Sequence, residues 1–379
     1  MFKTIANAFK VKDVRKKIFI TLLLLFIYRV GCWLPIPGFD IAKIDKDIEG
    51  NSYSIFSIMN MISGGALSNC SLLALGVSPY ITASIVIQLL TVAIPALEKL
   101  SKAGEDGRKK INLYTRIAAL VLSIAQAVGI VISYQSALDT SNALWVGAPT
   151  WLIATGIVLV LVAGGMFTVW LGEKITEIGI GNGMSLLIFV GILSTGADGI
   201  LTAIKSIGSN IINLWTILIF LAVMIAIFAL IVFVDCAERR VPVQYAKQIK
   251  GRKMYGGQST YIPIKVNGTN VMPIIFASAL ITFPQLIISM FWPGSSAEQW
   301  YQTWLGTGSW IYIVVLAVLI FAFAFFYAQI MFNTEDISKR IQQQGGFITG
   351  IRPGKPTADY LKKISKRITL FGAVFLAII

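Results

Sequence analysis

The chain has 379 residues, of which 56% are hydrophobic and 13% charged, with a net charge of +14 and a mean hydropathy of +0.76. This balance is far more apolar than that of a soluble domain and indicates a polytopic membrane protein. Histidine is absent, and Cys32, Cys70 and Cys236 lack metal-ligand spacing, which excludes histidine-based acid–base chemistry, Ser-His-Asp triads and ordinary zinc sites.

The apolar runs predict a series of membrane spans, since a spanning helix needs about 20 apolar residues. The predicted spans are residues 18–34, 77–96, 115–137, 151–171, 183–201, 213–234, 270–292 and 310–332, and a ninth begins near 368 and is still apolar at Ile379.

Residues 60–95 do not form an ordinary span, because glycines and a proline interrupt them. Gly64 and Gly65 precede a short apolar run at 67–75, and residues 76–79 separate it from a longer run at 80–94. The first run is too short to cross a bilayer. Broken segments persist in a membrane only where protein or a water-filled cavity surrounds them. We therefore expect this stretch to line a pathway through the protein.

The distribution of basic residues predicts the orientation. The segment before the first span and the loops 97–116, 172–182, 235–269 and 333–367 hold 28 of the 32 Lys and Arg residues. The opposite loops hold Lys43, Lys46 and Lys205, and Arg29 lies inside the first span. Basic loops stay in the cytoplasm, so the N-terminus is predicted to be cytoplasmic. Orientation alone accounts for the positive net charge.

Two of the basic loops, 235–269 and 333–367, are long for simple connections between spans. The first contains alternating runs at 240–246 and 259–266 joined through the basic residues 250–253, which predicts a β-hairpin with a cationic tip. Such a tip suits an acidic or phosphate-rich partner. It is equally compatible with a solvated turn that helps to orient the protein.

Other classes of function lack the residues that they need. Residues 350–357 have the wrong spacing for a phosphate loop and contain prolines, and the glycines at 179–183 do not join a strand to a helix. A solute transporter needs a charged or ion-coordinating site at mid-membrane, whereas only Arg29 is clearly charged within a span. A membrane enzyme lacks a nucleophile–base or metal set.

Large apolar side chains follow each break at helical spacing. Ile81 and Ile85 follow Pro79, Met184 and Ile188 follow the glycines at 179–183, and Ile275 follows Pro273. Pairs of this kind are usually packing contacts between helices. A ring of them can also close a pore by excluding water.

Several motifs resemble the SecY family, whose members form the channel subunit of the bacterial protein-conducting translocon. They are SGGALS at 63–68, PYITASIVIQLL at 79–90, GEDGRKK at 104–110, WLGEKITEIGIGNGMS at 170–185, YAKQIKGRKMYGGQSTYIPIKVN at 245–267, MPIIFAS at 272–278 and GIRPGKPTADYL at 350–361.

The resemblance implies an all-α polytopic fold with two inverted halves, a central hourglass pore, a short plug helix and a cytoplasmic β-hairpin-like loop. Residues 1–205 would form the N-terminal half with spans 1 to 5. Residues 206–379 would form the C-terminal half with spans 6 to 8 and the start of span 9, of the family's ten. The function implied is translocation of unfolded secretory polypeptides across the plasma membrane and release of membrane segments sideways into lipid.

The resemblance also assigns residues to four sites. The plug spans about 64–75 and includes Gly64, Gly65, Ala66, Leu67, Leu72 and Leu73. The pore ring consists of Ile81, Ile85, Met184, Ile188 and Ile275, and the polar residues of the lateral gate are Ser84, Gln88, Gln126 and Thr282. Local hydrogen bonds within a helix are an equal alternative for these polar residues. The cations expected to dock partners are Arg108, Arg252, Lys253 and Arg352.

The partners implied are the small membrane subunits SecE and SecG, the SecA ATPase, the ribosome, signal sequences, unfolded polypeptides and the lipid bilayer. The location implied is the bacterial plasma membrane. No cofactor or metal is expected, since SecA or the ribosome supplies the driving force. The protein itself is not expected to be an enzyme.

Overall fold

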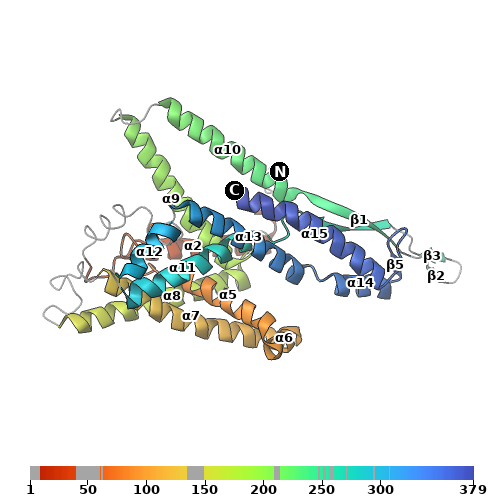
Figure 1. The fold of residues 1–379 in the computed structure, drawn as a ribbon, viewed down its shortest axis with the longest axis horizontal. Helices are drawn as coiled ribbons and strands as arrows, with labels where there is room; N and C mark the ends of the chain where they lie inside the picture. Colours follow the sequence, from red (N-terminus) through yellow and green to blue (C-terminus); the bar gives the residue numbers. More distant parts are fainter. Residues whose placement is uncertain are drawn as a thin grey trace. The chain divides into compact units, whose positions relative to one another are not determined.

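The computed structural model describes residues 9–39, 60, 63–134, 149–208, 214–245, 248–250, 253–255, 259–269, 271–292, 295–306 and 308–379. A long helix coincides with each predicted span (Figure 1). These helices are α2 (Lys12–Gly31), α5 (Ser78–Ala93), α7 (Glu105–Ser133), α8 (Thr150–Ile178), α9 (Gly183–Gly208), α10 (Leu214–Cys236), α11 (Met272–Phe291), α13 (Trp310–Met331) and α15 (Lys355–Ile378). Three shorter helices are α6 (Pro95–Lys102), α12 (Ser296–Leu305) and α14 (Thr334–Gln343).

Five helical stretches in the described part of the chain are long and apolar enough to cross a membrane, and a bent pair raises the number to six. The pair is α5 and α6, which meet at 107°. The bend lies at Ile94, because proline at 95 drives the residue before it out of the helical conformation, here to φ −108° and ψ 114°. In α2 and α15 the apolar part is shorter, since basic residues occupy the first half of each helix. The protein is thus a multi-pass membrane protein.

The chain forms two compact units, each of which is described by itself. The first comprises Met1–Ser209 and Thr282–Ser309, and the second comprises Asn210–Ile281 and Trp310–Ile379. In the first unit α5 packs against α7, α7 against α8, and α8 against both α2 and α9. In the second unit α15 packs against α13 and α14.

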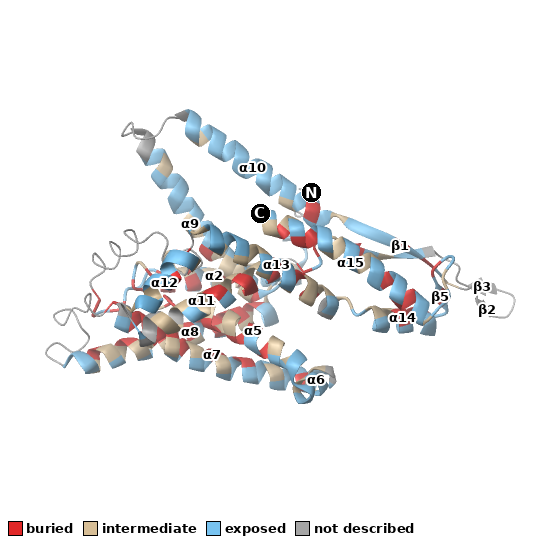
Figure 2. Ribbon diagram, in the orientation of Figure 1, coloured by how far each residue is buried: buried red, intermediate tan, exposed pale blue. Residues whose placement is uncertain are grey.

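Helix α8 is one of the more deeply packed helices of the first unit (Figure 2). Its buried face recurs every three or four residues and includes Ile153, Ile157, Leu161, Thr168 and Ile175. Helix α10 differs, because only 6% of its most apolar stretch of 18 residues is buried (Figure 2). A helix that is apolar on all sides and exposed suits contact with lipid.

The predicted β-hairpin is confirmed in the second unit. Strand β1 (Glu238–Tyr245) pairs antiparallel with β4 (Ser259–Lys265), so that Val241 lies opposite Ile262. The short strands β2 (Gln248–Lys250) and β3 (Lys253–Tyr255) continue the hairpin toward its tip, and β5 (Gly346–Phe347) pairs with the other edge of β1.

Residues 333–367 are not the long loop that the sequence predicted. They contain α14, β5 and the first half of α15. The helices form because apolar residues at helical spacing, among them Ile341, Leu361 and Ile364, pack with Val241 and Val243 of the sheet. Charged residues cover the outer faces of both helices. Because they interrupt the apolar residues along the sequence, the segment contains no continuous apolar run that would predict a helix.

Candidate functional site

The predicted plug lies within residues 63–77, here called the plug segment, which form consecutive turns rather than the short helix that was expected. Gly64, Gly65 and Gly76 have positive φ angles of 72°, 81° and 54°, and Cys70 has a φ of 45°. A right-handed helix cannot continue through such residues. Backbone hydrogen bonds of different sequence spacing close the turns instead. Cys70 N donates to Leu67 O, three residues earlier, whereas Ser71 N donates to Ala66 O, five residues earlier.

The chain that follows α2 pairs with the plug segment. Ile36 N donates to Cys70 O at 2.8 Å and Leu72 N donates to Leu34 O at 2.9 Å, on either side of an antiparallel bridge between Pro35 and Ser71. These bonds satisfy backbone groups that a membrane would leave without water. The plug segment is therefore held to the end of the first span by backbone bonds.

Three predicted plug residues and three predicted pore-ring residues lie in one apolar cluster of the first unit. The buried side chains of the cluster include Ala66 and Leu73, and Leu72 packs against them. The pore-ring residues that pack against the same cluster are Ile81, Met184 and Ile188. This cluster is called the waist cluster below, and its other members are Leu24, Leu25, Tyr28, Cys32, Val77, Tyr80, Leu171, Ile175, Leu186 and Leu187.

The other predicted residues of the two sites lie outside the waist cluster. Leu67 belongs to a neighbouring core that includes Leu75 and Leu161. Ile85 is buried within the first unit, with 5% of its surface exposed. Ile275 is half-buried on α11 in the second unit. The structure thus gathers part of the predicted pore ring beside the plug segment.

Two glycines of α8, which sequence reasoning did not single out, allow these close approaches. A Cβ atom at Gly164 would lie 1.8 Å from Leu72 O, and one at Gly172 would lie 2.4 Å from Met184 Sδ. Only glycine fits where backbone or a side chain comes this near a helix. The signal in the sequence is the pair Gly164–Gly165 in the middle of an apolar span, which is a common feature of helix contacts in membranes.

Two of the predicted gate residues, Ser84 and Gln88, contact each other within one helix. Gln88 Nε2 donates to Ser84 Oγ at 3.1 Å along α5, which is the alternative left open by the sequence. Gln126 on α7 is buried, and its Oε1 has no hydrogen-bond partner among the described residues. Thr282 is half-buried on α11. A buried amide without a full set of partners is poorly stabilised where it lies.

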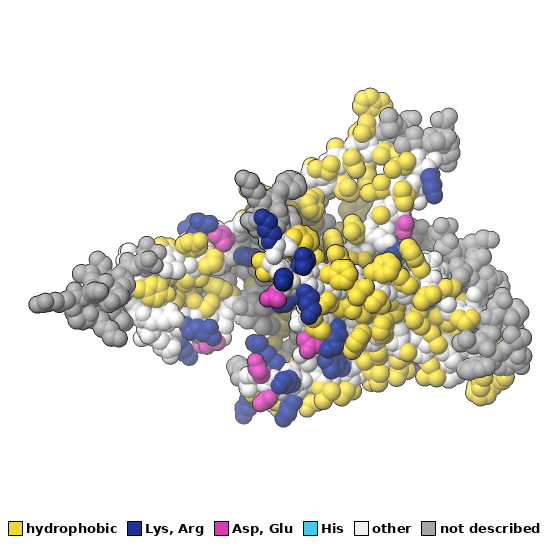
Figure 3. All heavy atoms as spheres, turned by 180° about the vertical axis from the view of Figure 1, so that it is seen from behind, with side chains coloured by type: hydrophobic (Ala, Val, Ile, Leu, Met, Phe, Trp, Pro, Cys, Tyr) yellow, Lys and Arg dark blue, Asp and Glu magenta, His cyan; other side chains and the backbone are white. Residues whose placement is uncertain are grey.

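The predicted docking cations are exposed wherever their side chains are described. Arg108 lies in the first turn of α7, and Arg352 precedes α15, where its carbonyl accepts a 2.8 Å hydrogen bond from Thr357 Oγ1. Lys253 begins β3, but its side chain and the whole of Arg252 lie outside the described residues. Figure 3 shows groups of cations and extensive hydrophobic side chains on the surface seen from this side.

At the base of the hairpin, Arg240 Nε donates to Glu238 Oε1 at 2.8 Å, and its guanidinium lies 4.8 Å from the centre of the Tyr261 ring. The hydrogen bond from the guanidinium to Glu238 raises the pKa of Arg240 above its ordinary value. The base of the hairpin therefore carries a cation that stays charged at any physiological pH.

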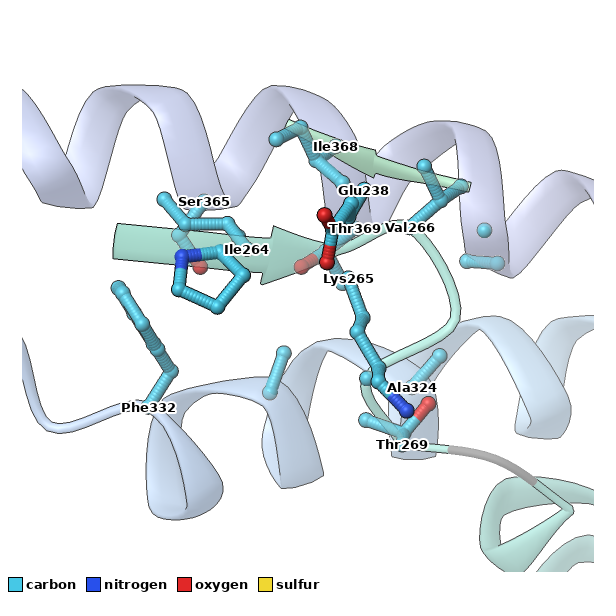
Figure 4. A pocket seen from close by; sticks show the side chains of 15 residues that line it. Glu238, Ile264, Lys265, Val266, Thr269, Ala324, Phe332, Ser365, Ile368 and Thr369 are labelled. Carbon is cyan, nitrogen blue, oxygen red and sulfur yellow. The ribbon is translucent and has the colours of Figure 1, made fainter. Parts of the chain in front are cut away.

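A cavity of about 370 Å³ lies in the second unit between β4, α13 and α15. Its lining is mainly apolar, and Lys265 extends across it from β4 toward Thr269, with Phe332 at the opposite side (Figure 4). None of the predicted site residues lines this cavity. It is thus separate from the waist cluster, all of whose members belong to the first unit.

The solved structures that resemble the chain share its fold. A structure described as "The structure of a protein conducting channel" covers 96% of this chain and 84% of its own, with a TM-score of 0.68 and 19% identity. A second, described by the plug domain of the SecY protein stabilising the closed state, gives a TM-score of 0.66 at 20% identity with the same coverage. Sec61 in a canine ribosome-channel complex gives 0.62 at 17% identity, again with that coverage.

Sequence comparison gives the family. The SecY family model matches residues 71–379. The protein translocase subunit SecY of Streptomyces galbus is 44% identical over 390 residues, and that of Mycobacterium bovis is 42% identical over 400 residues. Each alignment covers 100% of this chain and 88% of the relative. The chain belongs to the SecY family.

Proposed function

We propose that the chain conducts unfolded polypeptides through a waist sealed by Ile81, Ile85, Met184, Ile188 and Ile275 and closed by a plug that includes Gly64, Gly65, Ala66, Leu67, Leu72 and Leu73. Membership in the SecY family makes the chain a protein-translocation channel subunit rather than an enzyme. The proposal goes beyond family membership in naming the residues that close the channel. We also propose residues 1–205 and 206–379 as the two halves of the family's inverted repeat.

The observation that carries the proposal is the waist cluster, in which Ala66, Leu72 and Leu73 of the plug segment pack with Ile81, Met184 and Ile188. Aliphatic side chains in contact leave no polar group to hold a column of water, so ions cannot cross. The same side chains are soft enough to part around an extended chain, and the Met184 thioether adapts readily to its neighbours.

Opening requires that the plug segment leave the waist cluster. This change is a population shift, so a partner or a signal sequence must bind the open form more tightly than the closed one. We propose that Ser84, Gln88, Gln126 and Thr282 form the polar part of a lateral gate. The buried Gln126 Oε1, which lacks a partner among the described residues, supports this role because a gate must be weak enough to part.

We propose that the chain acts in the bacterial plasma membrane with SecE, SecG, SecA, the ribosome and signal sequences as partners. Its relatives are bacterial translocase subunits, and a structural neighbour is a ribosome-channel complex. Ribosomes present phosphates and acidic proteins present carboxylates, and both pair with exposed cations such as Arg108 and Arg352. Arg252 and Lys253 at the hairpin tip would belong to the same docking surface.

Crosslinking of a stalled secretory polypeptide tests the path. Single cysteines replace Ile81, Ile188 and Ile275 in the full-length chain with its partners present, and a photo- or thiol-reactive group on the stalled polypeptide reports proximity. The control is Leu159→Cys, because Leu159 on α8 is 65% exposed on the apolar surface. Crosslinks at all three sites and none at the control are expected.

The opposite pattern has a clear meaning. If the stalled polypeptide reached Leu159→Cys and none of the three waist positions, the proposed waist would be wrong. A solute transporter with its site at these positions would show substrate-dependent protection of the same cysteines from small reagents without any polypeptide crosslink.

A further inference from the structure

Arg29 is the charged residue that the sequence places within a span and that the proposed function does not use. It lies in the last turn of α2. Its Nη1 donates a hydrogen bond to Gly64 O at 2.7 Å, and its guanidinium lies 5.6 Å from the centre of the Trp33 ring. No carboxylate among the described residues forms an ion pair with it. A cation at membrane depth is costly and is usually retained for a function.

The acceptor of this bond is the first glycine of the plug segment. Gly64 has a φ of 72°, and a Cβ atom there would lie 2.8 Å from Arg29 Nη1 and 3.0 Å from both Cα and O of Gly191. The plug segment, α2 and α9 therefore meet at Gly64 without room for a side chain. The absence of a Cβ lets the guanidinium reach the carbonyl directly.

The end of α2 contacts the plug segment at further points. Gly31 packs against Leu73, since a Cβ at Gly31 would lie 2.5 Å from Leu73 Cδ1. Cys32 Sγ lies 4.0 Å from Ser63 O, a weak thiol hydrogen bond. Apolar contacts of this kind tolerate small displacements, whereas a hydrogen bond weakens steeply when its geometry changes. The bond from Arg29, like the two backbone bonds that Leu34 and Ile36 make with this segment, thus distinguishes the seated plug segment from a displaced one.

We propose that Arg29 is a positioning residue that latches the plug segment through its hydrogen bond to Gly64 O. The inference rests on the proposed role of residues 63–77 as the plug. A charge-assisted bond is about twice as strong as a neutral one. When the plug segment leaves, the guanidinium loses an acceptor in apolar surroundings, so opening is disfavoured until another acceptor replaces Gly64 O.

Resting ion conductance tests the latch. The full-length chain with its membrane partners is placed in lipid vesicles without a polypeptide substrate, and Arg29→Met is compared with the wild type. Loss of one charge-assisted bond should raise the fraction of open channels about tenfold. The conductance of Arg29→Lys should lie between those of Arg29→Met and the wild type. Lysine keeps the charge, but its compact ammonium cannot reproduce the geometry of the planar guanidinium. Arg116→Met is the matched control, since Arg116 instead pairs with Glu173 at 2.7 Å.

A pair of glycine variants tests the same bond from the acceptor's side. Gly64→Ala and Gly65→Ala share the strain of a positive φ, at 72° and 81°. Only the first brings a Cβ against Arg29, because a Cβ at Gly65 has Ser68 Oγ at 4.0 Å as its nearest neighbour. Gly64→Ala should therefore raise the conductance well above Gly65→Ala. Combined with Arg29→Met it should add little, as expected for residues that act through one contact.

A thiol reagent separates release of the plug segment from general loss of structure. Cys70 is buried in the plug segment and Cys236 is exposed at the end of α10. In a Cys32→Ala background, Arg29→Met should speed maleimide labelling of Cys70 about tenfold and leave the midpoint of thermal unfolding unchanged, while the exposed Cys236 calibrates the reactivity of an accessible thiol. Faster labelling of Cys70 together with a lowered unfolding midpoint would indicate loss of structure and overturn the latch.

The outcomes distinguish the latch from the plug itself. Leu73 is fully buried in the waist cluster, so Leu73→Asn should raise the conductance if residues 63–77 form the plug. If Leu73→Asn does so while Arg29→Met and Gly64→Ala match their controls, the plug stands and the latch is wrong. If Leu73→Asn also has no effect, the plug assignment fails. Should Arg29→Met not accumulate, Arg29→Lys and the glycine pair decide the question.

Discussion

Replacing Gly164 by alanine should displace the plug segment, because α8 approaches that segment through this glycine. A Cβ at Gly164 would lie 1.8 Å from Leu72 O and 2.9 Å from Leu72 C, whereas real Cβ atoms essentially never come closer than 3.0 Å to a neighbour. Both clashing atoms belong to the backbone, so no side-chain rotation relieves the overlap. Either α8 or the plug segment must move by about 1 Å.

The expected cost follows from two opposing terms. Overpacking a tightly packed site costs about 1–3 kcal/mol. Alanine in a helix interior gains about 1 kcal/mol relative to glycine, which offsets part of that cost. The difference leaves a net penalty of about 0–2 kcal/mol on the closed arrangement. A penalty of about 1.4 kcal/mol, within that range, lowers the ratio of closed to open channels about tenfold.

The assay is resting conductance in vesicles together with the midpoint of thermal unfolding of the solubilised complex. The neighbouring Gly165→Ala is the matched control, because its Cβ would lie 3.5 Å from Leu75 Cδ1, an ordinary contact. That variant should conduct like the wild type and be as stable or slightly more so. Equal conductance and equal unfolding midpoints for the two alanine variants would refute the reasoning.

Two further predictions concern the second unit. Leu361 is fully buried beneath the β-sheet, so Leu361→Ala should destabilise this unit by about 2–5 kcal/mol, measured as faster proteolysis of the region around the hairpin, whereas the exposed Lys363→Ala should match the wild type. Reversing the charges of Arg252 and Lys253 to Glu should weaken binding of an acidic or ribosomal partner, most strongly at low salt, without changing resting conductance. Unchanged binding at low ionic strength would remove these two residues from the docking surface.

The spans and the hairpin were predictable because local composition decides them. A run such as 213–234 must be a helix in lipid, since a helix satisfies every backbone group internally, and the structure places α10 at Leu214–Cys236. In the hairpin, alternation of apolar and polar residues sets the register, with Val241 and Val243 facing the core of the second unit. Neither inference needs knowledge of a distant partner.

The helices α14 and α15 show where this reasoning fails. Their sequence from 334 to 367 is rich in charge, so a search for continuous apolar runs leaves it as a loop. The apolar residues recur at intervals of three or four and face a sheet that lies about a hundred positions earlier in the chain. The apolar cluster that contains Ile341 and Val241 holds them there. A test for helical periodicity would have found both helices.

The geometry of the plug segment could not be predicted from local signals, although its breaks could. Gly64 and Gly76 mark where a helix must stop. What replaces the helix depends on residues far away, because Leu34 and Ile36 supply the backbone partners of Leu72 and Cys70. The sequence of turns that are stabilised by distant partners shows no periodic pattern of apolar residues from which they could be predicted.

The charged residue and the glycines that interrupt the apolar spans nevertheless make their contacts in one region, at the plug segment and beside it. Arg29 in α2 bonds the start of the plug segment, Gly164 in α8 admits its backbone, and Gly172 admits Met184 beside it. In lipid a cation or a missing side chain weakens a helix unless a close partner compensates. Because the compensating partner of all three lies in or beside the waist cluster, the exceptions in the apolar spans mark where the plug segment, which we propose to be movable, is seated. The same criterion singles out Gln126, whose Oε1 has no hydrogen-bond partner among the described residues and which we propose as part of the lateral gate.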